Sequence, residues 1–263
     1  MSIGAGPTAK MRVPHAIALV GDTVWALDIS PKRGLAVVIP PGDTVQQMAL
    51  PATSSTYDIA PVGGNLAIAV VQPTRANNVL PIVQVVTRRG QVVGNGCQLD
   101  PRYHKSDEKQ GIIGMFRGMG VTTFNARLYC RQAITPIVQV LDSVGRALGS
   151  ISVAPPFYHA PTDAPSSMNV ATVNKFRSSW WEHRQFFPTA TGFVSIYASY
   201  DSMSQNNRYR AFACDSAAGI RKCGVADVPG TPIEFLPPDT IVTAMPRTKA
   251  TERQAIAFLT IPR

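Results

Sequence analysis

The chain lacks any long hydrophobic run. None of its 263 residues lies in a stretch of the roughly eighteen apolar residues that a membrane-spanning helix requires. The first dozen residues, MSIGAGPTAKMR, lack the basic start and apolar core of a secretory signal peptide. Residues 1–12 are also the only segment that we expect to be flexible. The sequence therefore predicts no membrane span and carries no export signal of its own.

Familiar catalytic motifs are also missing. The chain has no G-x-S-x-G nucleophile elbow, no H-E-x-x-H zinc helix, no phosphate-binding glycine loop and no Asp-box. We therefore assign no catalytic residue, and we expect no cofactor.

Cysteine is scarce: the four residues have no spacing typical of a zinc site, so no metal ligands are assigned. In RYRAFACDSAAGIRKCGV, a two-residue turn at Ala218 and Gly219 would place Cys214 directly opposite Cys223. Opposite residues of a hairpin are close enough to form a cross-strand disulfide in an oxidising compartment. Two small buried thiols are the alternative, and the sequence does not choose between them.

Acidic residues are few, since 16 Asp and Glu stand against 25 Lys and Arg, which gives a net charge of +9. A basic chain invites a nucleic-acid partner. The basic residues are scattered in ones and twos, however, and the only adjacent arginines, Arg88 and Arg89, fall in a predicted tight turn. Nucleic-acid sites usually cluster on one element, so this distribution favours an ordinary solvated surface.

What the sequence does contain is an internal repeat. The pentapeptide PIVQV occurs at 81–85 and again at 136–140, and Gly90 and Gly145 follow at the same offset of 55 residues. The same offset relates the tyrosine-histidine pairs in DPRYHKSD and PPFYHAPTD. A fixed offset of this kind is the signature of a repeat architecture.

Around both copies, short apolar runs alternate with turn residues, which is typical of β-structure. Four-stranded units of about 40 to 60 residues are the blades of a β-propeller. We therefore predict an all-β propeller domain over residues 13–263 with five discernible blades, the last without its fourth strand. A β-sandwich is the main alternative, but it does not explain the offset. The predicted units start near Gly21, Gly63, Phe124, Thr191 and Asp239.

Two further stretches bear on this fold. In LAIAVV, large and small residues alternate, as expected when neighbouring blades cover both faces of a strand. The stretch VNKFRSSWWEHRQ is compatible with one or two helical turns, and its structure is left open.

Apolar strands separated by short Gly-Asp or Asp-x-x-Gly turns, as in ALVGDTVWALD and IVQVLDSVGRALGSI, resemble the blade pattern of bacterial six-bladed propellers of the NHL and TolB-like type. The resemblance covers residues 13–263 and concerns the fold more than the function. Because that group includes exported lipoproteins, it implies a periplasmic or extracellular location. Six blades in relatives against five here imply that this chain lacks a first blade.

The long loops of such a propeller are expected on one face. Turns between the first and second and between the third and fourth strands share one side, and the other connections, which include the long loops, share the opposite side. Long loops on a rigid scaffold are where binding sites are usually built. Residues in these loops that offer aromatic or polar contacts to a ligand are Arg75, Asn77, Arg102, Tyr103, His104, Tyr158, His159, Tyr200, Asn206 and Arg247.

The paired histidines allow two interpretations. His104 and His159, with Asp107 and Asp163, have the side chains of metal ligands or acid-base groups. A motif repeated in a repeat protein is usually architectural, however, and a tyrosine after proline can cap a strand end by hydrogen-bonding a carbonyl. We favour the architectural interpretation.

These observations lead to two functional hypotheses. The first is a non-enzymatic binding or scaffold propeller that recognises a protein or a glycan with the long loops of one face; nucleic acid is not the expected partner. The alternative is a propeller hydrolase with a divalent metal in its central channel. In the predicted inner strands only Asp58 and Asn174 offer oxygen ligands for that metal.

Overall fold

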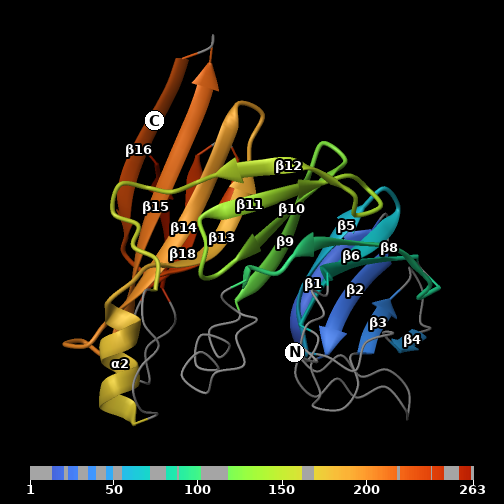
Figure 1. The fold of residues 1–263 in the computed structure, drawn as a ribbon, viewed down its shortest axis with the longest axis horizontal. Helices are drawn as coiled ribbons and strands as arrows, with labels where there is room; N and C mark the ends of the chain where they lie inside the picture. The colour runs from blue at the N-terminus through green and yellow to red at the C-terminus, as the bar shows by residue number, and fades with distance from the viewer. Residues whose placement is uncertain are drawn as a thin grey trace. The chain divides into compact units, whose positions relative to one another are not determined.

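A computed structural model gives the fold of the chain (Figure 1). Nearly all of its regular structure is β-strand. The described residues group into two compact units, considered separately below: unit 1 within 1–106, 117–131 and 138–151, and unit 2 within 107–116, 132–137 and 152–263. The structure describes residues 14–20, 23–28, 35–39, 46–49, 55–71, 81–87, 89–101, 118–161, 169–217, 220–237, 239–245 and 255–261.

The described strands form five sheets, each built from strands that follow one another in the sequence. The first sheet contains β1 (Pro14–Val20), β2 (Thr23–Asp28), β3 (Leu35–Ile39) and β4 (Gln46–Ala49). The second contains β5 (Ser55–Val62), β6 (Asn65–Val71), β7 (Pro81–Val86) and β8 (Val92–Gln98). The third contains β9 (Met119–Phe124), β10 (Arg127–Gln132), β11 (Ile137–Leu141) and β12 (Ala147–Ser152).

The last two sheets differ in size. The fourth contains β13 (Glu182–Pro188), β14 (Gly192–Asp201), β15 (Asn206–Ala217) and β16 (Ile220–Val228). The fifth contains only β17 (Thr231–Leu236), β18 (Thr240–Ala244) and β19 (Ile256–Thr260) among the described residues. Four four-stranded sheets and one sheet with three described strands agree with the prediction of five units.

These sheets are the blades of a β-propeller. In unit 1 the first strands of successive sheets contact one another, β1 against β5 and β5 against β9. Apolar side chains fill the space between neighbouring sheets: Trp25 of β2 and Leu66 of β6 belong to one buried cluster of unit 1. In unit 2, Ile196 of β14 and Phe235 of β17 belong to another. Within each unit, neighbouring blades therefore bury apolar side chains against each other, as this architecture requires.

The two copies of PIVQV are equivalent strands, as predicted. Each is the third strand of its sheet, β7 in the second and β11 in the third. The turns that follow also match: the Gly90 amide donates to the Thr87 carbonyl over 2.9 Å, and the Gly145 amide donates to the Asp142 carbonyl over 3.1 Å. The φ angles of the two glycines are 80° and 86°, values that other residues rarely adopt. The repeat therefore relates one blade to the next.

Strand β6 has the small side chains that the sequence led us to expect. Leu66 and Ile68 alternate with Ala67 and Ala69, and all four residues are at most 1% exposed. Both faces of this strand are covered, so the side chains on each face must pack closely against their neighbours. The β5–β6 turn is a Gly63-Gly64 pair with φ angles of 51° and 79°, the geometry of the tight turns that suit twisted hairpins.

The stretch left open in the sequence overlaps one helix, α2 (Val170–Ser178), which begins three residues before it. The Asn169 side chain caps its start by accepting a hydrogen bond from the Thr172 amide over 2.8 Å. Phe176 packs against Trp180 with ring centroids 6.0 Å apart. Strand β13 begins soon after, at Glu182, so only the first part of the stretch is helical.

Candidate functional site

The structure describes four of the ten predicted ligand-binding residues, all of them in unit 2. Tyr158 and His159 lie in the connection between β12 and β13, Tyr200 lies near the end of β14, and Asn206 begins β15. Outside the described residues lie Arg75, Asn77, Arg102, Tyr103, His104 and Arg247. Asp107 and Asp163, the carboxylates considered with the histidines, also lie outside them.

Tyr158 ties its connection to the segment between β10 and β11. Its hydroxyl donates to the Ile134 carbonyl over 2.8 Å, and its amide donates to the Pro155 carbonyl over 2.9 Å. The side chain is half-buried. This is the carbonyl-capping role weighed for the tyrosine-histidine motif.

His159 differs from its neighbour because its side chain is exposed. Its backbone carbonyl accepts a hydrogen bond from the Trp181 amide over 3.3 Å. The imidazole is therefore presented at the surface by a segment whose backbone is tied to the start of β13.

A cluster of aromatic rings lies under this connection. Phe157 meets the edges of Trp181 and Tyr197, with centroid separations of 4.9 and 5.8 Å. Tyr197 is fully buried and donates to the Val153 carbonyl over 2.6 Å. Burial raises the pKa of this tyrosine well above its usual range, so it stays a neutral hydrogen-bond donor. On its other side Tyr197 stacks on buried His183, 4.9 Å between centroids.

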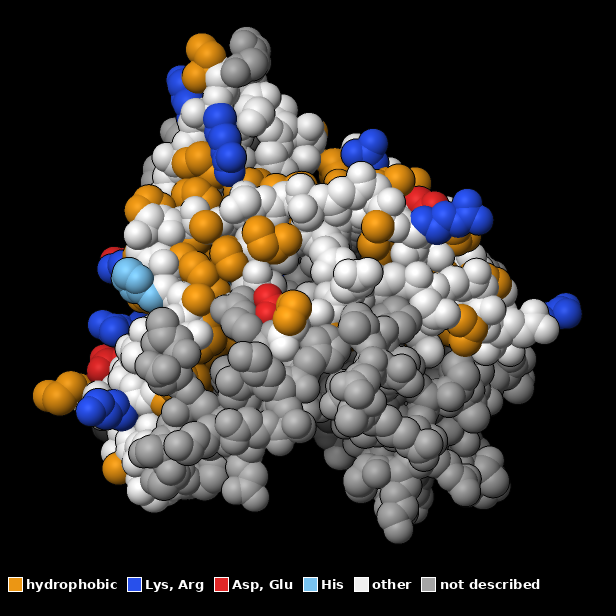
Figure 2. Space-filling model, viewed as in Figure 1, with side chains coloured by type: hydrophobic (Ala, Val, Ile, Leu, Met, Phe, Trp, Pro, Cys, Tyr) orange, Lys and Arg blue, Asp and Glu red, His pale blue; other side chains and the backbone are white. Residues whose placement is uncertain are grey.

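Arg210 of β15 brings a charge to the exposed side of the cluster. Its guanidinium carbon lies 5.3 Å from the centroids of both Phe157 and Trp181, within the range of cation–π attraction. Its Nε donates to Asp227 Oδ1 over 2.7 Å, and the two side chains are 38% and 79% exposed. Figure 2 shows hydrophobic side chains beside an exposed histidine on the face drawn there.

We call the residues Phe157, His159, Trp181, Arg210 and Asp227 the aromatic patch. The two half-buried rings, the guanidinium and the carboxylate contact one another, and the exposed His159 is joined to Trp181 through its backbone carbonyl. Aromatic residues and arginine contribute most to binding energy at protein interfaces. Sequence reasoning found only His159 of these, because the other four come together through strand pairing and loop folding rather than through a motif.

Tyr200 and Asn206 are placed less favourably for a ligand. Tyr200 is 9% exposed, and the Arg177 guanidinium of α2 covers its ring at 4.5 Å. Asn206 is exposed, but its side-chain amide donates to the Ser204 carbonyl over 2.8 Å. The predicted long loop between these residues is in fact a short turn at 202–205, since most of YDSMSQNNR belongs to β14 and β15.

No described side chains form a metal site. Among the described residues, no group of three or more His, Cys, Asp and Glu is placed to hold a metal ion. The carboxylate of Asp58 accepts hydrogen bonds from the amides of Ile59 and Val121, over 2.9 and 3.1 Å. Asn174 lies on α2 and not on an inner strand, which corrects its sequence-based assignment.

Cys214 and Cys223 form a disulfide, and they are paired directly across β15 and β16 as the predicted hairpin register requires. A second disulfide, between Cys97 of β8 and Cys130 of β10, was not foreseen. It joins two sheets of unit 1 across 33 residues of sequence. The available signal was arithmetic: an even number of cysteines leaves one further pair once Cys214 and Cys223 are matched.

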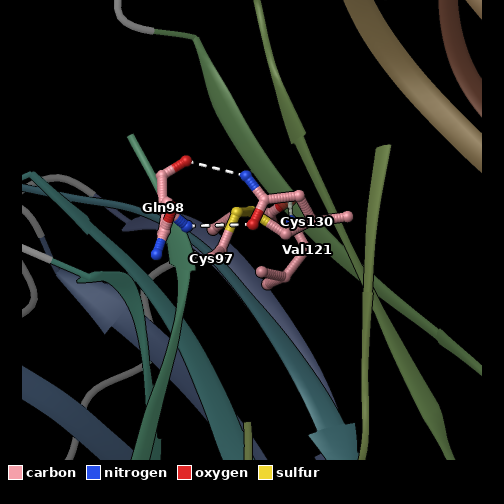
Figure 3. Close-up of a disulfide and its surroundings, with 6 residues drawn as sticks. Cys97, Gln98, Val121 and Cys130 are labelled. Carbon is pink, nitrogen blue, oxygen red and sulfur yellow. Dashed lines mark hydrogen bonds between the residues drawn. A yellow bond between two sulfur atoms is a disulfide. The ribbon is translucent and has the colours of Figure 1, made fainter. Parts of the chain in front are cut away.

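Figure 3 shows the Cys97–Cys130 disulfide beside Gln98. The side chain of Gln139, in the second PIVQV copy, accepts from the Gln98 amide over 2.9 Å and donates to the Gln98 carbonyl over 2.7 Å. The Gln139 side chain thus pairs with both backbone groups of Gln98, as the backbone of a neighbouring strand would. Gly96 of β8 lies so close to the Gly145 carbonyl that a Cβ atom would collide with it.

Comparison with known proteins supports the fold. No protein-family model and no curated protein sequence matches the chain. A Bacteroides vulgatus member of the DUF4221 family has a similar structure, with a TM-score of 0.59 and 8% identity over 91% of this chain and 76% of its own. A Bacteroides fragilis protein described as exported is similar with a TM-score of 0.55 and 10% identity over 85% of this chain.

These similarities concern the fold alone, because the identities are low. The chain spans 63% of the length of the Bacteroides fragilis protein. They do not extend to the NHL or TolB-like type or to six blades. Among the described helices none has the length and apolarity to cross a membrane.

Proposed function

We propose that this propeller is a non-enzymatic binding or scaffold protein that recognises a protein or glycan ligand through the loop-rich edge of its blades, with the aromatic patch of unit 2 as a principal contact. The observation that carries the proposal is the position of Arg210. It lies against Phe157 and Trp181 while remaining partly exposed, so its guanidinium can face a ligand from a fixed support.

The chemistry of the patch suits both ligand classes. Aromatic faces pack against the apolar faces of sugar rings or against peptide side chains, and they lose little conformational entropy in doing so. Arg210 and Asp227 supply charged hydrogen-bonding groups beside those rings. The predicted ligand-binding residues that lie outside the described part, among them Arg102, Tyr103 and Arg247, belong to the same proposal as further contacts on their own loops.

The proposal is tested on a printed array of oligosaccharides and on an array of peptides, with the purified protein as the probe. The double variant His159→Ala, Arg210→Ala should lose at least about tenfold in affinity for the features that the unmodified protein binds. Its free energy of unfolding should change by no more than about 1 kcal/mol, because both side chains are partly or fully exposed.

Arg89→Ala is the matched control. Arg89 is an exposed arginine in the turn between β7 and β8, and its removal takes away the same charge. Equal loss from both variants would show that net charge carries the binding. Absence of selective binding on either array would contradict the proposal, and stoichiometric calcium or zinc in the purified protein would favour the propeller hydrolase.

A further inference from the structure

The two disulfides differ in access. Cys97 and Cys130 are 3% and 1% exposed, so both sulfurs are shielded within unit 1. In the β15–β16 hairpin, Cys214 is also buried, at 5%, but Cys223 is exposed on the edge strand. A thiolate that approaches from solvent can therefore reach one sulfur of the second bond and neither sulfur of the first.

An arginine lies beside the Cys214–Cys223 bond. The Arg221 guanidinium lies 3.6 Å from the Cys214 sulfur, and it also lies over the Phe193 ring at 5.7 Å. Lys222 adjoins Cys223 on the same exposed strand. A nearby cation stabilises a thiolate, and thiol–disulfide exchange is faster when the leaving sulfur is stabilised as an anion.

We propose that Cys214–Cys223 is a reducible disulfide, cleaved in the folded protein by an external dithiol, with Cys223 as the attacked sulfur and Cys214 as the leaving group. A thiolate of the dithiol attacks Cys223 Sγ and forms a mixed disulfide. The electron pair of the broken bond passes to Cys214 Sγ, where Arg221 stabilises the anion.

The second thiol of the dithiol then completes the exchange. It attacks the dithiol's own sulfur in the mixed disulfide, closes the oxidised dithiol and releases Cys223 as a thiolate. Two electrons and two protons pass in total from the dithiol to the two cysteines. The hairpin strands are paired from Tyr209–Val228 to Ala217–Ile220, on both sides of the disulfide, so the proposed reduction does not require unfolding.

The buried pair is the internal control for the experiment. The folded protein is treated with dithiothreitol, quenched at intervals with an alkylating agent, and analysed by peptide mass spectrometry. Cys214 and Cys223 should become alkylated together, while Cys97 and Cys130 remain unlabelled until a denaturant is added. Simultaneous labelling of all four cysteines, earlier labelling of Cys97 and Cys130, or labelling before any reductant is added would overturn the proposal.

A separate experiment tests which of the two sulfurs the external thiolate attacks. Glutathione, a monothiol, should leave its mixed disulfide on Cys223, and recovery of the adduct on Cys214 would contradict the assignment. Arg221 is a positioning residue here: Arg221→Gln should slow reduction about three- to tenfold, whereas Lys222→Gln should change the rate less.

A spectroscopic readout separates this role from a structural one. In the reduced protein, the ultraviolet absorbance of the thiolate should appear at higher pH in Arg221→Gln than in Lys222→Gln. Unchanged absorbance with a slower rate would show that Arg221 acts only by supporting the hairpin, and it would remove Arg221 from the mechanism.

Discussion

The two compact units are each stabilised internally by different chemistry. In unit 1, a disulfide joins β8 to β10, and the Gln139 amide pairs with the backbone of Gln98 beside it. In unit 2, tyrosine hydroxyls do this work: Tyr158 and Tyr197 donate to carbonyls of the segments on either side of the β11–β12 hairpin. Because each blade of a repeat protein contacts only its neighbours, each junction can be stabilised independently.

The two disulfides also differ in the elements that they connect. The Cys97–Cys130 bond connects two sheets, whereas the Cys214–Cys223 bond lies within one hairpin whose strands are already paired. In the chain-entropy model, loops of 33 and 9 residues correspond to about 3.7 and about 2.6 kcal/mol of stabilisation. A disulfide therefore stabilises unit 1 more than unit 2. The exposed disulfide of unit 2 is the one that we propose to be reducible.

Removal of the disulfides should produce the largest effects. The double variant Cys97→Ala, Cys130→Ala should lower the free energy of unfolding by about 3.7 kcal/mol, and Cys214→Ala, Cys223→Ala by about 2.6 kcal/mol. Urea unfolding of the oxidised proteins measures both values. An equal or reversed order would contradict the view that the inter-sheet bond is the more important one for stability.

Much of the propeller could be predicted because its signals are local. The PIVQV strands, their glycine turns and the opposition of Cys214 to Cys223 all follow from turn chemistry and alternation within a few residues. The helix was left open because VNKFRSSWWEHRQ changes from helix to strand within a few residues. Its first part is the end of α2, whose capped start at Asn169 lies before the stretch, while its last part begins the half-buried strand β13.

The candidate site was less predictable because its contacts join distant parts of the chain. Tyr158 and its acceptor Ile134 are 24 residues apart in sequence, and Cys97 and Cys130 are 33 residues apart. No periodic pattern encodes such pairs. Arg210 could not be chosen over other arginines, since its position between two rings depends on the fold of the β12–β13 connection.

The tyrosine junction of unit 2 should show the next largest effect. Tyr197→Phe removes only the hydroxyl that donates to the Val153 carbonyl. Because Val153 is also fully buried, its carbonyl loses that donor out of reach of solvent, and the free energy of unfolding should fall by about 1–3 kcal/mol. Tyr209→Phe is the matched control, since the Tyr209 hydroxyl lies in a half-buried setting and accepts only a 3.4 Å bond from Asn207.

The pH dependence of folding stability provides a second test of the Tyr197 contact. Burial raises the pKa of Tyr197 above its ordinary value of 10.0, so the unfolded chain loses this proton at a lower pH than the folded one. The contribution is complete below about pH 10 and is lost as pH rises further. Wild type should therefore lose more stability than Tyr197→Phe in alkaline urea titrations, and parallel curves would contradict the assignment.

The amide junction of unit 1 should show the smallest effect. Gln139→Glu keeps the shape of the side chain but cannot donate to the Gln98 carbonyl at neutral pH, so we expect a loss of about 1 kcal/mol at this exposed edge. A protonated glutamic acid regains the donor, so stability should recover as pH falls towards the ordinary glutamate pKa of about 4.3, and the recovery should be complete below that pH. Gln91→Glu, which adds the same charge at an exposed position of the β7–β8 turn, is the control. Recovery of the same size in both variants would show that the charge, rather than the paired amide, sets the stability of this junction.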